Sequence, residues 1–254
     1  MLSNPWFYAT AVPAILITGI SKGGFGTGLG IVAVPLMSLA MPTPQAAGIM
    51  LPILLVMDAV GLLGYRNRWD RGHMAIMLPA AMVGIALGAL TFGLVDEAWL
   101  KVLIGLIAVA FTLHNWLAPR GGRGKPASRS VLKGGFWSAL SGYTSFVAHA
   151  GGPPISVYLL PLRLDKTLFT GTAVVFFAVV NVVKLLPYGL LGQLNMGNLW
   201  AAAVLSPLAP AGMLLGMRLH QRIDAEVFYR VCYGLVLVAG AKLLYDGAAH
   251  LLAG

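Results

Sequence analysis

Residues 21–30 read Ser-Lys-Gly-Gly-Phe-Gly-Thr-Gly-Leu-Gly and interrupt an otherwise apolar run from Phe7 to Ala40. Glycine releases the backbone from helix geometry, and hydrocarbon tolerates the freed N–H and C=O groups only where protein or a water-filled cavity receives them. A second interruption, residues 143–154, lies in another apolar run about half a chain later. Paired broken helices in corresponding positions of two halves are typical of the central site of a transporter. The two stretches therefore predict a transport site at membrane depth.

Composition places the chain in a membrane. Of its 254 residues, 58% are hydrophobic and 10% are charged, whereas a soluble domain carries about 25% charged residues. Apolar runs of about 20 residues recur, and each can cross a hydrocarbon core of roughly 30 Å. The start of the sequence lacks the positive region of a signal peptide, so we expect no cleaved leader. The predicted crossings are residues 44–65, 73–95, 99–117, 168–190, 199–219 and 227–251.

The basic residues indicate whether the two broken segments cross the membrane. If all eight apolar segments cross, nine basic residues fall on one side and six on the other. If both broken segments are re-entrant hairpins, thirteen share one face and only Lys101 and Lys242 lie opposite. The hairpin arms are also each too short to span, namely Phe7–Ile20, Ile31–Ala40, Gly135–Ala148 and Ile155–Leu162. Because basic residues mark the cytoplasmic face, we predict six crossings, two hairpins and both termini outside, and no nucleic-acid partner for the charge of +9.

The two halves of the chain also resemble each other, which indicates a duplication. The matching pairs are Gly48 and Gly171, Asp58 and Asn181, Tyr65 and Tyr188, Pro79 and Pro207, Gly84 and Gly212, Gly88 and Gly216, and Asp96 and Asp224. A repeat of one hairpin and three crossings has an odd number of crossings, so its second copy must be inverted. We therefore predict an all-α integral membrane protein of two inverted repeats, residues 1–117 and 134–254, joined by a cytoplasmic linker at residues 118–133. Glycine pairs let helices pack closely within one protomer or between two, so a homodimer stays open.

Charged side chains inside a bilayer are costly unless they face a cavity or a partner, so the few that occur are functional candidates. Lys22, beside Gly24 and Gly26, would offer an ammonium and freed backbone N–H groups, a combination that holds an oxyanion where a helix begins. Lys22 could instead reach the interface or pair with Asp58. Asp58 is then either that partner or a carboxylate that takes up a proton during transport.

Two further intramembrane candidates follow in the second half. His149 precedes Gly151 and two prolines, and proline at the first position of a half-helix leaves the helix end free to point at a ligand. This histidine could gain a proton to hold an anion, or stay neutral and bond a carbonyl. Asn181 and Lys184 lie at i and i+3 on one helix face and could line the same cavity, although Lys184 could reach an interface instead.

Hydroxyl groups at the two tips complete the predicted site. Thr27, Thr144 and Ser145 could donate to an oxyanion, although Ser and Thr inside membranes more often bond their own backbone. Enzyme motifs fail on context, since residues 28–33 fit a dinucleotide fingerprint without its soluble strand-helix unit, and a P-loop needs its lysine after the glycines. The histidines show no metal-ligand spacing, and Cys232 stands alone. We predict no enzyme, no cofactor and no metal site.

Residues 22–37, 141–145 and 151–160 together resemble the TauE/SafE sulfite exporter family of bacterial membrane permeases. The resemblance extends over about residues 6–245 of the chain. It implies transport of small sulfur-containing anions such as sulfite, sulfonates or sulfoacetate, commonly as efflux, across the bacterial inner membrane, with both termini then periplasmic. Members of the family that carry thiosulfate are expected to use several cysteines in the pore. This chain departs from that pattern.

The sequence thus predicts a permease in which both hairpin tips build one central cationic site and the helix bundles rock around it. Lys22, His149 and Lys184 would attract the anion, while Asp58 pairs with Lys22 or carries a coupling proton. The expected partners are a small anionic substrate and the lipid bilayer. An anion channel, a proton-coupled uptake carrier for another small organic anion, and a membrane sensor that moves nothing stay open as alternatives.

Overall fold

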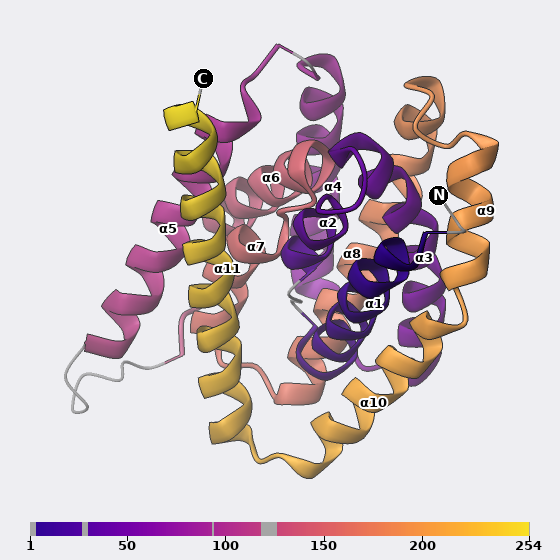
Figure 1. Cartoon of the computed structure of the whole chain (residues 1–254). Helices are drawn as coiled ribbons and strands as arrows, with labels where there is room; N and C mark the ends of the chain where they lie inside the picture. Colours follow the sequence, from indigo (N-terminus) through magenta and orange to yellow (C-terminus); the bar gives the residue numbers. More distant parts are fainter. Residues whose placement is uncertain (1–3, 27–29, 93, 118–125, 254) are drawn as a thin grey trace. The chain divides into compact units, whose positions relative to one another are not determined.

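The computed structural model describes residues 4–26, 30–92, 94–117 and 126–253, and every regular element within these ranges is a helix (Figure 1). The predicted all-α class is confirmed. Thr27 and residues 118–125 of the linker lie outside the described residues.

Among the described residues, five single helices are long and apolar enough to cross a membrane, and a sixth candidate is a pair of helices bent by 46°. The single helices are α3 (Thr43–Gly64), α4 (Arg71–Leu90), α5 (Glu97–Leu117), α8 (Lys166–Leu190) and α11 (Ala225–Ala253), and the bent pair is α9 (Met196–Leu205) with α10 (Leu208–Arg222). They coincide with the six predicted crossings. The bend falls at Ser206 and Pro207, where proline lacks the N–H that a continuous helix needs.

The chain forms two compact units, and each combines segments that are far apart in the sequence. The first unit comprises Met1–Asp70 and Thr170–Ile223, and the second comprises Arg71–Phe169 and Asp224–Gly254. The first unit contains α1 (Pro5–Phe25), α2 (Gly30–Met37), α3, α9, α10 and all but the first turn of α8; the second contains α4, α5, α6 (Val131–Ala148), α7 (Gly152–Leu159), the 3₁₀ helix η2 (Leu160–Leu162) and α11. The predicted division into two repeats concerns order along the chain and stays a prediction.

The first glycine-rich stretch does not break the helix where the sequence indicated. α1 begins after Asn4, whose side chain accepts a hydrogen bond from the N–H of Trp6, and it continues through Gly23 and Gly24 to Phe25. Both glycines face the backbone of α10, where an added Cβ atom would collide with carbonyl oxygens. Glycine in a helix costs about 1 kcal/mol relative to alanine, and here the close approach of two helices offsets that cost. The expectation that these two glycines free the backbone is wrong.

The break lies at Gly26, the residue that ends α1. Its φ of 71° is in the left-handed region that glycine adopts readily. Its N–H still donates to the carbonyl of Lys22 at 3.0 Å, so this group too is used by the helix. An added Cβ would also meet Thr170 and Ala173 on α8. Both backbone conformation and space therefore require glycine here.

The second broken segment consists of α6 and α7, separated at His149. This histidine has a φ of 51°, a left-handed conformation that is uncommon outside glycine. α1 and α6 have 21 and 18 residues, or about 31 and 27 Å at 1.5 Å per residue. Both helices extend beyond the predicted arms Phe7–Ile20 and Gly135–Ala148, but neither is among the candidate spans found in the described residues. α2 and α7, of eight residues each, are as short as predicted.

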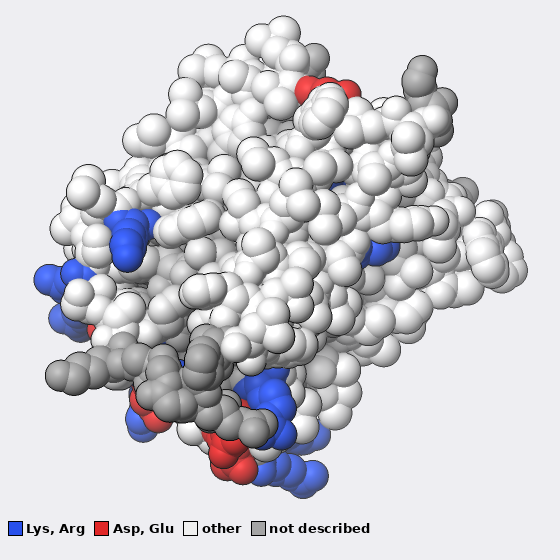
Figure 2. All heavy atoms as spheres, turned by 90° about the vertical axis from the view of Figure 1, so that its left-hand side faces the viewer, with Lys and Arg blue, Asp and Glu red and all other residues white. Residues whose placement is uncertain are grey.

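The second unit exposes apolar side chains along α5 and α11. Figure 2 looks onto the side of these two helices, and most of the surface that it shows is uncharged. The exposed large side chains include Trp99, Leu103, Leu106 and Trp116 on α5 and Val238, Tyr245 and Leu252 on α11. Soluble monomers rarely expose such side chains in continuous patches. This surface suits contact with lipid.

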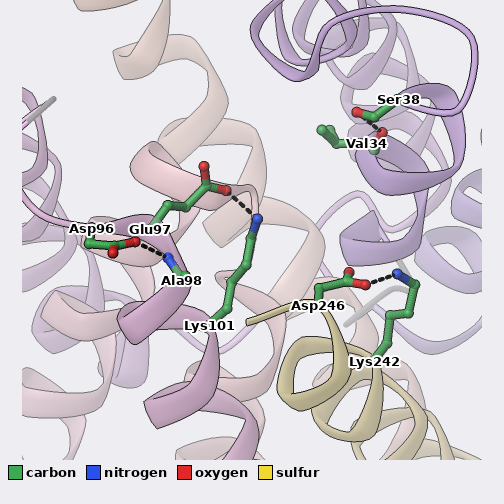
Figure 3. Close-up of polar contacts among 8 residues, drawn as sticks. All are labelled: Val34, Ser38, Asp96, Glu97, Ala98, Lys101, Lys242 and Asp246. Carbon is green, nitrogen blue, oxygen red and sulfur yellow. Dashed lines mark hydrogen bonds and ion pairs between the residues drawn. The ribbon is translucent and has the colours of Figure 1, made fainter. Parts of the chain in front are cut away.

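Two basic residues on the same two helices are each paired with a carboxylate one turn away (Figure 3). The Nζ atom of Lys101 lies 2.8 Å from Oε1 of Glu97 on α5. On α11, Lys242 pairs with Asp246 in the same way. These are the two basic residues that the charge count placed opposite the basic face. Each of their charges is therefore balanced locally.

Candidate functional site: a buried cluster of two lysines and one aspartate

The first unit holds charged side chains from three helices in one buried cluster. The Nζ atom of Lys22, near the end of α1, lies 2.6 Å from Oδ1 of Asp58 on α3. The second carboxylate oxygen, Oδ2, accepts a hydrogen bond of 2.7 Å from Nδ2 of Asn181 on α8. The predicted alternative of a Lys22–Asp58 pair is therefore confirmed. Both oxygens of the carboxylate are engaged, as a buried charge requires.

Lys184 lies one turn after Asn181 on α8. Its Nζ atom is 5.3 Å from the centroid of the Tyr188 ring, a cation–π distance. The charges of both Lys22 and Asp58 also act on it. None of the four polar residues of the cluster is more than 5% exposed. Lys22 thus contacts the carboxylate of Asp58, and Lys184 lies within range of its charge, in a place closed to solvent.

Lys22 occupies the opposite end of a helix from the one predicted. The sequence placed it where a helix begins, beside the backbone N–H groups that hold an anion, but it lies in the last turn of α1. At this end the helix dipole is negative and stabilises the ammonium group itself. The interpretation of Gly24 and Gly26 as freed N–H donors is wrong for the same reason. Any attraction of an anion here comes from side chains.

Two side chains that sequence reasoning missed hold the last carbonyls of α1. The hydroxyl of Tyr65, at the end of α3, donates to the carbonyl of Gly23 at 2.6 Å. A ring nitrogen of His220 on α10, Nδ1, lies 2.8 Å from the carbonyl of Gly24 and must donate to it. The last carbonyls of a helix have no partner within the helix. Tyr65 and His220 therefore fix the turn that carries Lys22. One indication of this role was visible in the sequence, because Tyr65 and Tyr188 occupy equivalent positions of the predicted duplication.

The second break is held together by its own hydroxyl groups. The Ser141 hydroxyl donates to the carbonyl of Gly151 at 2.7 Å. The Thr144 hydroxyl lies 3.1 Å from the carbonyl of Ala150 and 3.3 Å from that of Ser141. The alternative that a buried hydroxyl bonds its own backbone is thus confirmed for Thr144. An added Cβ at Gly151 would collide with Ser141 and Ser145, so this glycine permits the close contact of α6 and α7.

The family profile described as "Sulfite exporter TauE/SafE" matches residues 11–243. The chain belongs to the TauE/SafE family. Comparisons with curated proteins and with solved structures gave no significant match. Membership implies a membrane transporter of sulfite or a related sulfur-containing anion, not an enzyme. The apolar helices agree with a multi-pass membrane protein.

In this TauE/SafE protein, the structure brings part of the predicted site together. Lys22, Asp58, Asn181 and Lys184 form the cluster of the first unit, with Gly24 and Gly26 on the same arm. Thr144, Ser145, His149 and Gly151 belong to the second unit, and Thr27 lies outside the described residues. A single site shared by both broken segments stays a prediction.

The cluster offers ammonium and amide donors and one carboxylate. Among the described residues, no three His, Cys, Asp or Glu side chains gather in a way that could hold a metal ion. Lysine presents a compact charge with three rotatable N–H donors. In a TauE/SafE transporter this chemistry fits the binding of an oxyanion.

Proposed function

We propose that this TauE/SafE protein exports sulfite, or a sulfonate or sulfoacetate, and that the buried cluster of Lys22, Asp58, Asn181 and Lys184 binds the anion. One observation carries the proposal: two buried lysines, one paired with Asp58 and the other within range of its charge, lie where solvent is excluded. With both lysines protonated, the cluster is positive. An anion that enters it restores the charge balance, because opposite charges interact strongly where water is excluded.

Asp58 competes with the anion for the two lysines. In the structure it contacts Lys22 directly, while its charge also reaches Lys184. An anion bound between the lysines weakens the hold of Lys22 on the carboxylate. Asp58 can then take up a proton or turn toward Asn181. This exchange couples substrate binding to a change of conformation, as alternating access requires.

Contacts at equivalent glycines support the proposal of two repeats. The predicted equivalents Gly84 and Gly212 are separated by 128 positions. Positions 16 and 139 are separated by 123, as are the predicted equivalents Asp58 and Asn181. Gly84 on α4 packs against the carbonyl of Ala139 on α6, and Gly212 on α10 packs against the carbonyl of Leu16 on α1. Each half thus makes the same contact with the first broken arm of the other half.

The two breaks and two helix starts agree with the same offsets. Gly26 and His149, which differ by 123 positions, both have a positive φ. Asp96 and Asp224, which differ by 128, both cap a helix, accepting hydrogen bonds of 2.7 and 2.8 Å from backbone N–H groups (Figure 3 shows Asp96). Equivalent local geometry at these distances along the chain is what a duplication produces.

The pairing of α5 with α11 supports an inverted arrangement. Along α5, Ala98 lies near Gly247, Gly105 near Gly240, and Asn115 near Tyr233 on α11. Rising numbers on one helix meet falling numbers on the other, so these equivalent helices run antiparallel. An axis in the membrane plane relates helices in this way, whereas an axis along the membrane normal would make them parallel.

We further propose that both termini are periplasmic. With two hairpins, thirteen basic residues share one face and two lie opposite. Those two, Lys101 and Lys242, are each neutralised by a carboxylate on the next turn. The face opposite the thirteen therefore carries little free positive charge, as the positive-inside rule expects of a periplasmic face.

Counterflow of labelled sulfite in proteoliposomes tests the function. Lys184→Met keeps the length of the side chain and removes its charge, and it should abolish counterflow. Lys101→Met removes a partly exposed lysine of an i,i+4 pair and should leave transport unchanged. Sulfite, sulfoacetate, taurine, sulfate and thiosulfate are then compared by thermal stabilisation of the purified protein, since a ligand of the folded state raises its stability. Equal counterflow in both variants would remove Lys184 from the site.

The same vesicles separate the alternatives. A carrier shows saturation and counterflow, whereas a channel shows neither. An imposed proton gradient tests the direction of transport. If it drives the anion into the compartment that corresponds to the cytoplasm, the protein is an uptake carrier and not an exporter. No flux of any anion would leave a sensor or structural protein.

A further inference from the structure

We propose that Thr18 is a hydroxyl donor to the transported oxyanion and a determinant of its affinity. The inference rests on the proposed function and deepens it. Thr18 lies on α1 and is only 1% exposed. Its hydroxyl has no hydrogen-bond partner among the described residues.

Thr10 and Thr112 show what a buried helical hydroxyl ordinarily does, whereas the hydroxyl groups of Thr18, Ser138 and Thr170 have no hydrogen-bond partner among the described residues. Thr10 on the same helix lies 3.1 Å from the carbonyl of Phe7, and Thr112 donates to the carbonyl of Ala108 at 2.9 Å. Such bonds to the preceding turn are the ordinary solution for Ser and Thr in helices. Native proteins rarely leave a buried polar group unsatisfied, and such a group calls for a water, an ion or a ligand. The Thr18 hydroxyl is therefore available to something that enters the protein.

The position of Thr18 points to the anion site. Thr18 and Lys22 are at i and i+4, so their side chains lie on one face of α1. Gly19 and Gly23 lie on an adjacent face of the helix, about 100° away, against the backbone of α10. Thr18 therefore shares the face from which Lys22 reaches Asp58.

The depth of Thr18 along the helices agrees with this placement. Gly26 lies beside Thr170 at the start of α8. Lys22, one turn earlier on α1, is linked through Asp58 to Asn181, which lies about three turns further along α8. Going back along α1 thus corresponds to going forward along α8. Thr18, a further turn back on α1, is therefore displaced from Lys22 in the direction that runs from Thr170 toward Asn181 and Lys184 on α8.

A hydroxyl supplies what two lysines lack. Ammonium groups attract any small anion, because they act as compact charges with freely rotating donors. A helix-borne hydroxyl has one donor in a fixed place, and sulfite and sulfonates present three oxygens that can accept it. Thr18 would therefore favour an anion with several oxygens over a spherical one such as chloride.

The test compares two valine variants of one helix. Thr18→Val removes the hydroxyl at nearly constant volume, Thr18→Ser keeps it, and Thr10→Val is the matched control. For sulfite counterflow, we expect Thr18→Val to raise KM about tenfold or more, as the loss of a hydrogen bond to a charged ligand does. The KM of Thr18→Ser should remain within about threefold of the wild-type value. Thr10→Val should have the same KM as the wild type. Without ligand, Thr18→Val should melt about 2–4 °C higher, since an unsatisfied hydroxyl has been removed.

The outcomes distinguish the two proposals. A wild-type protein that responds to no anion overturns the proposed function and the role of Thr18 with it. If the wild type transports sulfite and Thr18→Val does so with the same KM, the role of Thr18 alone is overturned. Its hydroxyl would then be hydrogen-bonded to a structural water. Should Thr18→Val fail to fold, Thr18→Ala is measured in the same way.

Discussion

The Nζ atom of Lys22 lies 2.6 Å from Oδ1 of Asp58, and the two side chains come from different helices that meet out of contact with solvent. Breaking a buried pair by removing one partner strands the other charge. Asp58→Asn should therefore lower the free energy of unfolding by about 3–5 kcal/mol. The double variant Lys22→Met/Asp58→Leu removes both charges and should recover most of that loss while transporting nothing. Thermal unfolding of the two variants checks this, and equal destabilisation of both would contradict it.

Tyr65→Phe should loosen the turn that carries Lys22. The variant removes the hydroxyl that donates a hydrogen bond to the carbonyl of Gly23. Loss of this buried hydrogen bond should lower the free energy of unfolding by about 1–2 kcal/mol. The sulfite concentration for half-maximal transport should rise, because Lys22 is no longer held in place. Tyr245→Phe is the control, since that side chain is 71% exposed. A change in stability with no change in half-saturation would limit Tyr65 to a structural role.

Gly84→Ala should destabilise the second unit. Its Cβ would press on the carbonyl of Ala139, and overpacking of this kind costs about 1–3 kcal/mol. Gly234→Ala, in a helix with no atom within 4 Å of the new methyl group, should instead stabilise by about 0.5–1 kcal/mol. Unfolding midpoints of the pair measure the difference, and shifts of the same sign would refute the close contact. Gly212→Ala, at the predicted equivalent position, should behave like Gly84→Ala.

Two substitutions at His149 separate its backbone from its imidazole. Both Gly and Ala remove the ring, but only glycine accepts the φ of 51° without strain. His149→Gly should therefore be more stable than His149→Ala by about 1 kcal/mol. If the imidazole binds the anion, both variants should lose sulfite affinity to the same extent. Unfolding and sulfite titrations on the two proteins supply the comparison, and wild-type affinity in both would exclude the ring from the site.

The candidates for the site were visible in the sequence because charge is rare at membrane depth. Lys22, Asp58 and Lys184 were identified on that ground alone, and spacing placed Asn181 on the face of Lys184. The location of the break was not visible. Gly23 and Gly24 weaken a helix in isolation, but their contact with α10 keeps them helical, and a contact nearly two hundred residues away leaves no local trace.

The same limit explains the residues that were missed. Thr18 differs from Thr10 only in what surrounds it, and His220 is one of five histidines in an apolar chain. Nothing in their neighbouring residues distinguishes them. Their roles depend on which helices pack against each other. The same packing decides that Lys22 pairs with Asp58 and does not reach the membrane interface.

The sequence by itself determined the helical membrane class, the family and the short set of intramembrane charges, because hydrophobicity and the cost of burying charge are local properties of the chain. Only the tertiary structure decided which charges share a cluster, which glycines serve packing and which serve a turn, and which of the described hydroxyl groups lack a hydrogen-bond partner. Those outcomes depend on contacts between helices that are distant in sequence, and the free energy of such contacts outweighs the local preferences of the residues that make them.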